Sequence, residues 1–292
     1  MQLANHHAHS HFSDGRLSPR EYLQEAIAQG LKTYGFSDHA PVPGSAVGLM
    51  SLEELERYLA EIDTLKQMYE EDIQVYKSLE VDYIPGVIAM DSPHILESEL
   101  DYVIGAVHFV DAFADGTPWG FEESVECFER GVTEIFNGSI QAAVERYYAL
   151  IREMVEDFRP TIVAHLDRIK KWNRGERFFS ESSPWYLEAI DKTLVSIAEV
   201  GSIMEVNTKG YYKNETAEPY PGRRILIQSK QMGIPVHLAS DAHHPENITK
   251  GFEFGTSLLL ESGYEQISVL SDGEWMPAPL KPSKLHPAPF RK

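Results

Sequence analysis

Short apolar, β-branched runs alternate with longer amphipathic runs along most of the chain, a pattern typical of proteins built from strand–helix repeats. Seven apolar runs predict strands, and an eighth, weaker one follows them: residues 2–6, 32–37, 73–80, 102–107, 161–165, 203–207 and 234–240, then 266–270. The amphipathic runs predict helices at about 19–29, 52–71, 138–157, 184–201 and 221–233. This order predicts an α/β fold in which helices cover a parallel sheet.

Local start and stop signals support these helices. Residues 18–21 (SPRE) and 51–54 (SLEE) are capping boxes, in which a serine and a glutamate satisfy free N–H groups at the start of a helix. Pro184 suits the first position of a helix, and Gly30 and Gly201 suit the position after its end. The predicted helices therefore have defined ends as well as an apolar face.

Three long segments rich in glycine and proline follow predicted strands, at residues 40–50, 109–120 and 208–222. We expect them to overhang one rim of the fold, where they could shape a substrate pocket. The tail from Pro277 carries four more prolines and is expected to be irregular. Residues 1–292 are expected to form a single domain.

The composition is that of a globular protein: 292 residues, 42% of them apolar and 24% charged. No run of 18 apolar residues is present, and the N-terminal residues are neither basic nor apolar, so we expect neither a membrane partner nor a signal peptide. Cys127 is the single cysteine, which leaves no disulfide within the chain and suits a reducing compartment. A cytoplasmic location is the expectation.

The formal net charge is −19, from 45 acidic and 26 basic residues. A nucleic-acid-binding surface is basic, so nucleic acid is not an expected partner. Solubility alone is one explanation for this acidity. A phosphorylated substrate would require local positive charge at its site, which bound divalent cations would supply.

Metal-binding side chains stand at or just after the ends of the predicted strands. They are His7, His9, Asp14, His39, Glu80, His108, His165, Glu205, Asp241 and His243. Taken singly, each has an ordinary alternative, such as a hydrogen-bonded core histidine, a turn aspartate or a helix cap. The carboxyl ends of parallel strands meet at one rim, however, so the joint placement predicts a site for more than one metal ion. The other six histidines lack this placement and are expected not to be ligands.

These residues fall in motifs that resemble the PHP (polymerase and histidinol phosphatase) superfamily. The motifs are His7-x-His9-Ser10, Ser13-Asp14-Gly15, Ser37-Asp38-His39, Glu80, His108, His165 and Ser240-Asp241-Ala242-His243. Within the superfamily the chain looks most like the histidinol-phosphate phosphatases, through residues 79–85 (LEVDYIP), 205–210 (EVNTKG) and 218–221 (EPYP). The resemblance implies a distorted (β/α)7 TIM-like barrel with a trinuclear metal site.

The family pattern implies three metal sub-sites in this chain. The first would be held by His7, His9, Glu80 and Asp241; Glu80 would bridge to a second, completed by His108 and His165; Asp14, His39 and His243 would hold the third. Glu205 has no ligand role in that pattern and is expected to pack against or orient a neighbour. Two to three divalent ions are implied, and imidazole with carboxylate ligands suits zinc, iron or manganese.

The residues expected to contact substrate are less well defined. An arginine common in the family is absent near Tyr212, so Lys213 or Lys209 is a candidate for its contact with phosphate, beside Arg168 and Lys170 after the fifth strand. Two aromatic residues at the end of the 109–120 segment, Trp119 and Phe121, either contact an imidazole-bearing ligand or pack in the core.

The resemblance implies hydrolysis of a small-molecule phosphomonoester, L-histidinol phosphate, to L-histidinol and phosphate. Glu80, Asp241 and His243 are the expected catalytic residues, with Asp241 or His243 passing a proton to the leaving oxygen. Two alternatives stay open: a PHP phosphoesterase acting on another phosphomonoester or nucleotide, and a non-catalytic metal-binding protein. The sequence does not indicate an oligomeric state.

Overall fold

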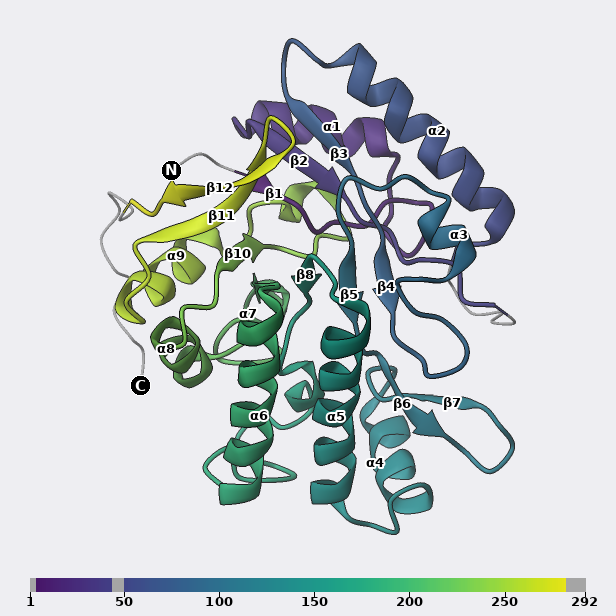
Figure 1. The fold of residues 1–292 in the computed structure, drawn as a ribbon, viewed down its shortest axis with the longest axis vertical. Coiled ribbons are helices and arrows are strands. Elements are labelled where there is room, and N and C mark those ends of the chain that lie inside the picture. The colour runs from purple at the N-terminus through teal and green to yellow at the C-terminus, as the bar shows by residue number, and fades with distance from the viewer. Residues whose placement is uncertain (1–3, 44–49, 282–292) are drawn as a thin grey trace.

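The computed structural model describes residues 4–43 and 50–281, and eight of its strands form two parallel sheets (Figure 1). One sheet has the order β1-β2-β3 and the other β10-β9-β8-β5-β4. Their bounds are β1 (Ala4–Asn5), β2 (Thr33–Phe36), β3 (Gln74–Lys77), β4 (Glu80–Asp82), β5 (Ile104–Ala106), β8 (Ile162–Val163), β9 (Ile203–Asn207) and β10 (Val236–Ala239). The prediction of an α/β fold with parallel strands is confirmed.

Two isolated parallel bridges join the sheets into a ring. Ala8 pairs with Ala242, which links the end of β1 to the end of β10, and His39 pairs with Glu80, which links the end of β2 to β4. The strand expected at 73–80 is divided into β3 and β4 near Ser78. Before this point β3 pairs with β2, and after it β4 pairs with β5. The two strands together fill one of seven positions, as expected for a distorted (β/α)7 barrel.

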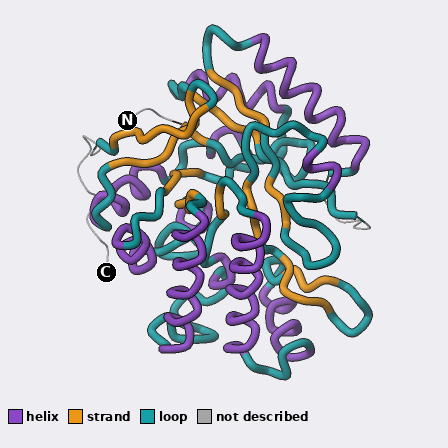
Figure 2. The backbone as a smooth tube through the Cα atoms, in the orientation of Figure 1, coloured by secondary structure: helices purple, strands orange, loops and turns teal. Residues whose placement is uncertain are grey.

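Helices surround this ring (Figure 2). The longer ones are α1 (Pro19–Ala28), α2 (Leu52–Met68), α4 (Val125–Glu134), α5 (Ile140–Phe158), α6 (Pro184–Val200), α8 (Arg223–Gln231) and α9 (Phe252–Glu261). Five of them were predicted to within three residues at each end, and both capping boxes are formed. Sequence patterns did not indicate α4 and α9, nor the short helices α3 (Pro93–Leu96) and α7 (Lys209–Tyr212).

The segment expected to be a loop at 109–120 is an antiparallel hairpin of β6 (Phe109–Ala112) and β7 (Pro118–Gly120). Trp119 is fully buried, and its indole packs against Phe128 of α4 and donates a hydrogen bond to the carbonyl of Cys127. Phe121 is also buried, edge-on to Tyr147. The hypothesis that these two rings contact a ligand is therefore wrong, and they anchor the hairpin to the core.

A second hairpin, β11 (Gln266–Ser271) with β12 (Glu274–Pro279), lies outside the ring. The weak eighth strand is thus real but antiparallel. Its Leu270 packs on Tyr76 and Tyr102, with Trp275 of β12 beside them. Residues 277–279 were expected to be irregular; instead they belong to β12, which pairs with β11 alone, and an edge strand tolerates proline. Residues 282–292 of the tail lie outside the described residues.

The structure bears on the expectation that no helix crosses a membrane. Within residues 4–43 and 50–281, none of the helices has the length and apolar character needed to cross a bilayer.

Gly131 of α4 tests how the first hairpin is anchored. A Cβ atom there would lie 2.0 Å from Cε2 of Trp119, so the indole would have to move. We expect Gly131→Ala to lower the free energy of unfolding by at least about 1–3 kcal/mol, as overpacking does. Thr133→Ala, on the exposed side of the same helix, should change it by less than about 0.5 kcal/mol in the same urea titration. Equal stability of the two variants would contradict this packing.

Candidate metal centre

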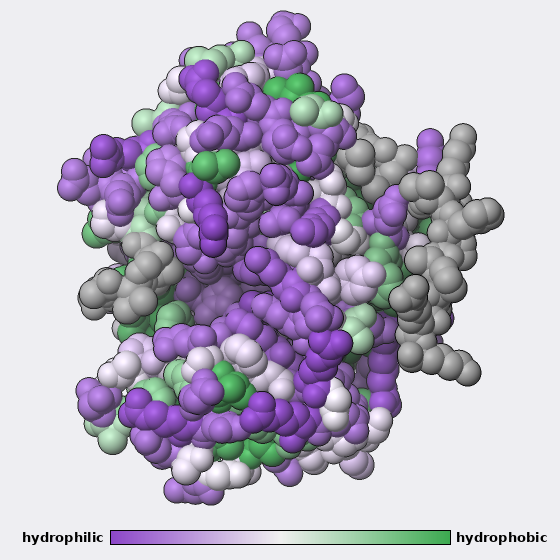
Figure 3. Space-filling view, turned by 180° about the vertical axis from the view of Figure 1, so that it is seen from behind, coloured by the Kyte–Doolittle hydropathy of each residue, from purple (hydrophilic) through white to green (hydrophobic). Residues whose placement is uncertain are grey.

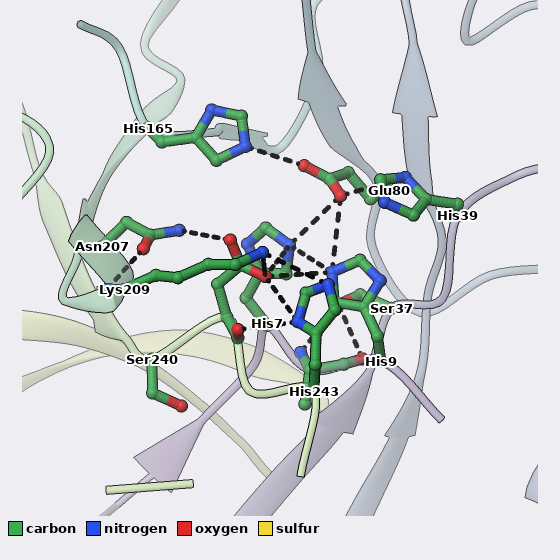
Figure 4. A network of polar contacts seen from close by, with 12 residues as sticks. His7, His9, Ser37, His39, Glu80, His165, Asn207, Lys209, Ser240 and His243 are labelled. Atoms are coloured by element: carbon green, nitrogen blue, oxygen red, sulfur yellow. Dashed lines mark hydrogen bonds and ion pairs between the residues drawn. The ribbon is translucent and has the colours of Figure 1, made fainter. Parts of the chain in front are cut away.

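All nine predicted metal ligands come together at one rim of the ring. His7, His9, His39, Glu80, His165 and His243 are labelled in Figure 4. His7 and His9 follow β1, His39 follows β2, and His108 follows β5. His165 follows β8, Glu80 opens β4, Asp241 and His243 follow β10, and Asp14 lies on the turn before α1. The ring therefore brings together residues that are up to 236 positions apart in the chain.

The first group of ligand atoms is fully buried. Nε2 of His7 lies 3.1 Å from Nε2 of His9, which in turn lies 3.2 Å from Oδ1 of Asp241. Oε2 of Glu80 is 3.4 Å from Nε2 of His7 and 3.5 Å from Nε2 of His9. These four residues match the first sub-site that the family resemblance implies.

The second group uses the other oxygen of Glu80. Oε1 lies 3.0 Å from Nε2 of His165 and 3.7 Å from Nε2 of His108, and the two imidazole nitrogens are 3.2 Å apart. Glu80 thus directs one oxygen at each of two imidazole pairs. This is the geometry that a bridging carboxylate requires.

The third group is the most exposed. Oδ2 of Asp14 lies 2.9 Å from Nε2 of His243, and Oδ1 lies 3.9 Å from Nε2 of His39 and 3.4 Å from Nδ1 of His9. The Asp14 side chain is 45% exposed, against 4% or less in the first group. His39 also lies 3.3 Å from Glu80, so it is shared between the second and third groups.

The imidazole pairs fit divalent metal ions. Two nitrogens bound at about 2.0–2.1 Å to one tetrahedral ion would lie about 3.3 Å apart, close to the separations of His7 from His9 and His108 from His165. These nitrogens face one another across carboxylate oxygens, with no thiolate nearby. Divalent metal binding is therefore the chemistry of this rim.

The electrostatics of the groups also favour cations. Burial would lower the pKa of His108, but Asp82 and Glu80 overcome this and raise the pKa to about 10. Burial would likewise lower the pKa of His7, yet Glu205, Glu80 and Asp241 raise it well above its usual value. The carboxylates thus make a strongly negative pocket, and metal ions would replace the protons that it attracts.

Two further carboxylates hold the ligands in place. Oε1 of Glu205 lies 2.6 Å from Nδ1 of His7, and Oε2 accepts a hydrogen bond from the backbone N–H of His165. Oδ1 of Asp82 lies 2.7 Å from Nδ1 of His108. Such contacts fix the orientation of a ligating imidazole. Glu205 orients a neighbour, as expected, whereas the role of Asp82 was missed, although it lies two residues after Glu80 and so on the same side of β4.

Two ligands sit on strained backbone. The φ angles of His165 and Asp241 are 21° and 50°, in the left-handed region that residues with a side chain rarely adopt. Strain of this kind gathers at functional sites, because surrounding contacts are needed to maintain it.

A cleft of about 560 Å³ opens over the second and third groups, and Figure 3 shows a hydrophilic hollow on the face of the molecule seen from behind. Of the basic residues expected at phosphate, Arg168 and Lys209 line the cleft. Lys170 does not: it is buried with its Nζ 2.7 Å from Asp167, because successive side chains of the 3-10 turn Arg168–Lys170 point in different directions. Lys213 follows α7, is exposed, and does not line the cleft either.

Lys209 is the basic residue nearest to the ligand groups. Its Nζ lies 3.1 Å from Oδ1 of Asp241 and 3.2 Å from Nε2 of His243. Tyr212, at the position of the missing arginine, donates a hydrogen bond to the carbonyl of Asp241 at 3.3 Å. Lys209 thus places a positive charge beside Asp241 and His243, and it stays a candidate for the phosphate contact.

The fold is a barrel-like α/β ring of parallel strands, and side chains suited to divalent metal ions gather at one rim of it. These two features define the class of protein. The PHP domain model matches residues 5–209. The "Probable histidinol-phosphatase" of Deinococcus radiodurans is 32% identical over 244 residues, covering 82% of this chain and 85% of that protein. The histidinol-phosphatase of Bacillus subtilis is 28% identical over 276 residues, covering 87% and 98%. The chain belongs to the PHP domain family, in the group of the histidinol-phosphatases.

Solved structures support the fold. HisK from Listeria monocytogenes superposes with a TM-score of 0.76 at 21% identity, covering 86% of this chain and 99% of that one. The histidinol phosphate phosphatase of Lactococcus lactis, solved with zinc, L-histidinol and phosphate, gives a TM-score of 0.69 at 21% identity, covering 94% and 99%. The expected PHP fold is confirmed.

Removal of the Glu205 carboxylate should weaken metal binding. We expect Glu205→Gln to lower the apparent metal affinity about 10- to 100-fold, because His7 loses the partner that orients it. Chelator competition, followed by metal analysis of the protein, measures the effect. Glu199→Gln, at an exposed position of α6, is the matched control and should retain metal like the wild type. Equal retention by the two variants would show that Glu205 only packs.

Proposed function

We propose that this chain is a metal-dependent phosphatase that hydrolyses L-histidinol phosphate to L-histidinol and phosphate. The observation that carries the proposal is Glu80, whose two oxygens face two separate imidazole pairs in a chain of the PHP family. The substrate is suggested by the names of relatives that align over most of the chain, and by the histidinol and phosphate bound in one structure of the same fold. A cytoplasmic location suits this function.

The proposed metal content is two to three ions of zinc, iron or manganese. His7, His9, Glu80 and Asp241 would hold the first ion; Glu80, His108 and His165 the second; Asp14, His39 and His243 the third. When bound, such ions acidify water for attack on phosphorus and neutralise charge on the phosphate oxygens. The greater exposure of Asp14 makes the third the least protected of the three.

Side chains at the edge of the cleft are proposed to transfer a proton and to contact phosphate. Asp241 and His243 lie beside the ligand groups, with Nδ1 of His243 3.4 Å from Oδ1 of Asp241. We assign the transfer of a proton to the leaving oxygen to one of them, Asp241 or His243. Lys209 lines the cleft and is placed to contact phosphate as a point charge. Arg168 lines the cleft too, but its Nε and Nη1 already donate hydrogen bonds to Glu122 and Glu215.

A direct assay tests the substrate. We expect the metal-loaded protein to release phosphate from L-histidinol phosphate in preference to a panel of other phosphomonoesters and nucleotides. Glu80→Ala should abolish turnover and lower the metal content, because two groups of ligands lose a shared member. If the protein prefers another ester, the proposed phosphatase activity stands and the proposed substrate is wrong. A metal-loaded protein without any turnover would indicate a binding protein instead, and full activity of Glu80→Ala would contradict the bridging role.

Lys209→Ala tests the phosphate contact. Loss of a charge-assisted hydrogen bond should raise both KM and the inhibition constant of inorganic phosphate about tenfold or more. Steady-state kinetics with metal content measured on the same samples gives both values. Lys213→Ala removes the same charge four residues later, outside the cleft, and should behave like the wild type. If Lys213→Ala weakens phosphate inhibition and Lys209→Ala does not, the assignment is reversed.

A further inference from the structure

One carboxylate oxygen beside the cleft lacks a partner. Glu122 lies two residues after β7, and its Oε2 accepts a hydrogen bond from Nε of Arg168 at 2.7 Å and lies 3.6 Å from Nζ of Lys171. Its Oε1 is buried and has no hydrogen-bond partner in the part of the chain that the structure describes. An unpaired buried carboxylate oxygen is unfavourable, so this atom is suited to a donor that arrives with a ligand.

Oε1 of Glu122 lies close to the second proposed metal sub-site. It lies 3.8 Å from Nε2 of His108, which is a proposed ligand of the second sub-site. Glu122, His108 and Arg168 all line the same cleft. A group bound at Oε1 would therefore sit next to the second sub-site, where a phosphate ester would be held.

We propose that Glu122 binds the ammonium group of the substrate and so selects amino-alcohol phosphates over phosphomonoesters that lack an amine. This inference rests on the proposed function and adds a specificity-determining residue to it. In L-histidinol phosphate the amine is on the carbon next to the one that carries the ester oxygen, so it stays close to the scissile bond. An ammonium offers three charged donors, of which one satisfies Oε1.

The rest of the cleft suits the remainder of such a substrate. Beyond the metal ligands its wall is partly apolar, with Ile84, Val87 and Phe109. Phe109 is the aromatic residue of the first hairpin that reaches the cleft, whereas Trp119 and Phe121 are buried in the core. The imidazole of the substrate would extend toward this wall while the ammonium stays at Glu122.

A pair of substrates isolates the amine. The second substrate is 3-(imidazol-4-yl)propyl phosphate, which keeps the imidazole, the chain and the ester but has no amine. The ratio of the two kcat/KM values, measured with metal-loaded enzyme, should favour L-histidinol phosphate in the wild type. In Glu122→Gln, which keeps the shape and removes the charge, this ratio should fall about 10- to 100-fold, mainly through KM. The metal content should not change.

Glu123→Gln is the matched control, since it removes the same charge from the exposed neighbouring residue at the same cleft. Its ratio should equal that of the wild type. If Glu122→Gln does not fold, the same ratio is measured for Glu122→Asp, which keeps the charge on a shorter side chain. A fall in the ratio for this variant supports the contact.

Other outcomes overturn the inference in distinct ways. An equal loss on both esters would show that Glu122 only positions Arg168, and loss of metal would make it a ligand. If the wild type hydrolyses both esters equally well, the role of Glu122 is overturned, whereas the proposed phosphatase activity stands. A metal-loaded wild type that hydrolyses neither ester overturns both proposals.

Discussion

The buried carboxylate of Glu80 is the interaction around which the rest of the structure is arranged. Its two oxygens face the imidazole pairs His7–His9 and His108–His165, at separations of 3.0–3.7 Å. An ionised group in the interior costs several kcal/mol of free energy unless charged partners surround it. Those partners come from separate strands, so only a fold that gathers strand ends at one rim can supply them. A ring of parallel strands does so, because every carboxyl end lies on the same side.

Holding these charges imposes conditions on the residues behind them. Glu205 and Asp82 fix the imidazoles of His7 and His108, and the contacts around His165 and Asp241 keep both in unfavourable backbone conformations. Each such conformation costs on the order of 1–3 kcal/mol, which the core must offset. Part of that core is the cluster in which Leu270 and Trp275 of the second hairpin pack against Tyr76 and Tyr102.

The sequence predicted what depends on local periodicity and on strand ends. All seven ring positions were recognisable, because buried parallel strands are continuous apolar runs. Most of the nine predicted ligands follow these strands directly, whereas Glu80 begins β4 and Asp14 lies on the turn before α1. The hairpin of β6 and β7 was not recognisable, because its strands are short and glycine and proline lie in β7 and in the turn before it. Only tertiary packing shows that Trp119 faces the core. Arg168 and Lys170 differ in the direction of their side chains, which the spacing of residues in the sequence does not determine in a 3-10 turn.

The two cations that line the cleft, Arg168 and Lys209, have different carboxylate partners. Arg168 is bonded to Glu122 and Glu215, so its charge is largely balanced within the protein. Oε1 of Glu122 has no hydrogen-bond partner among the described residues, and we propose a cationic ligand group for it. Lys209 has Asp241 as its carboxylate partner, and that carboxylate is also a proposed metal ligand. Once Asp241 is engaged by a metal ion, the ammonium of Lys209 is available to an anion. A substrate with a phosphate and a neighbouring ammonium would be held in one orientation by Lys209 and Glu122, and an acidic protein could in this way select a phosphorylated amine without a basic surface.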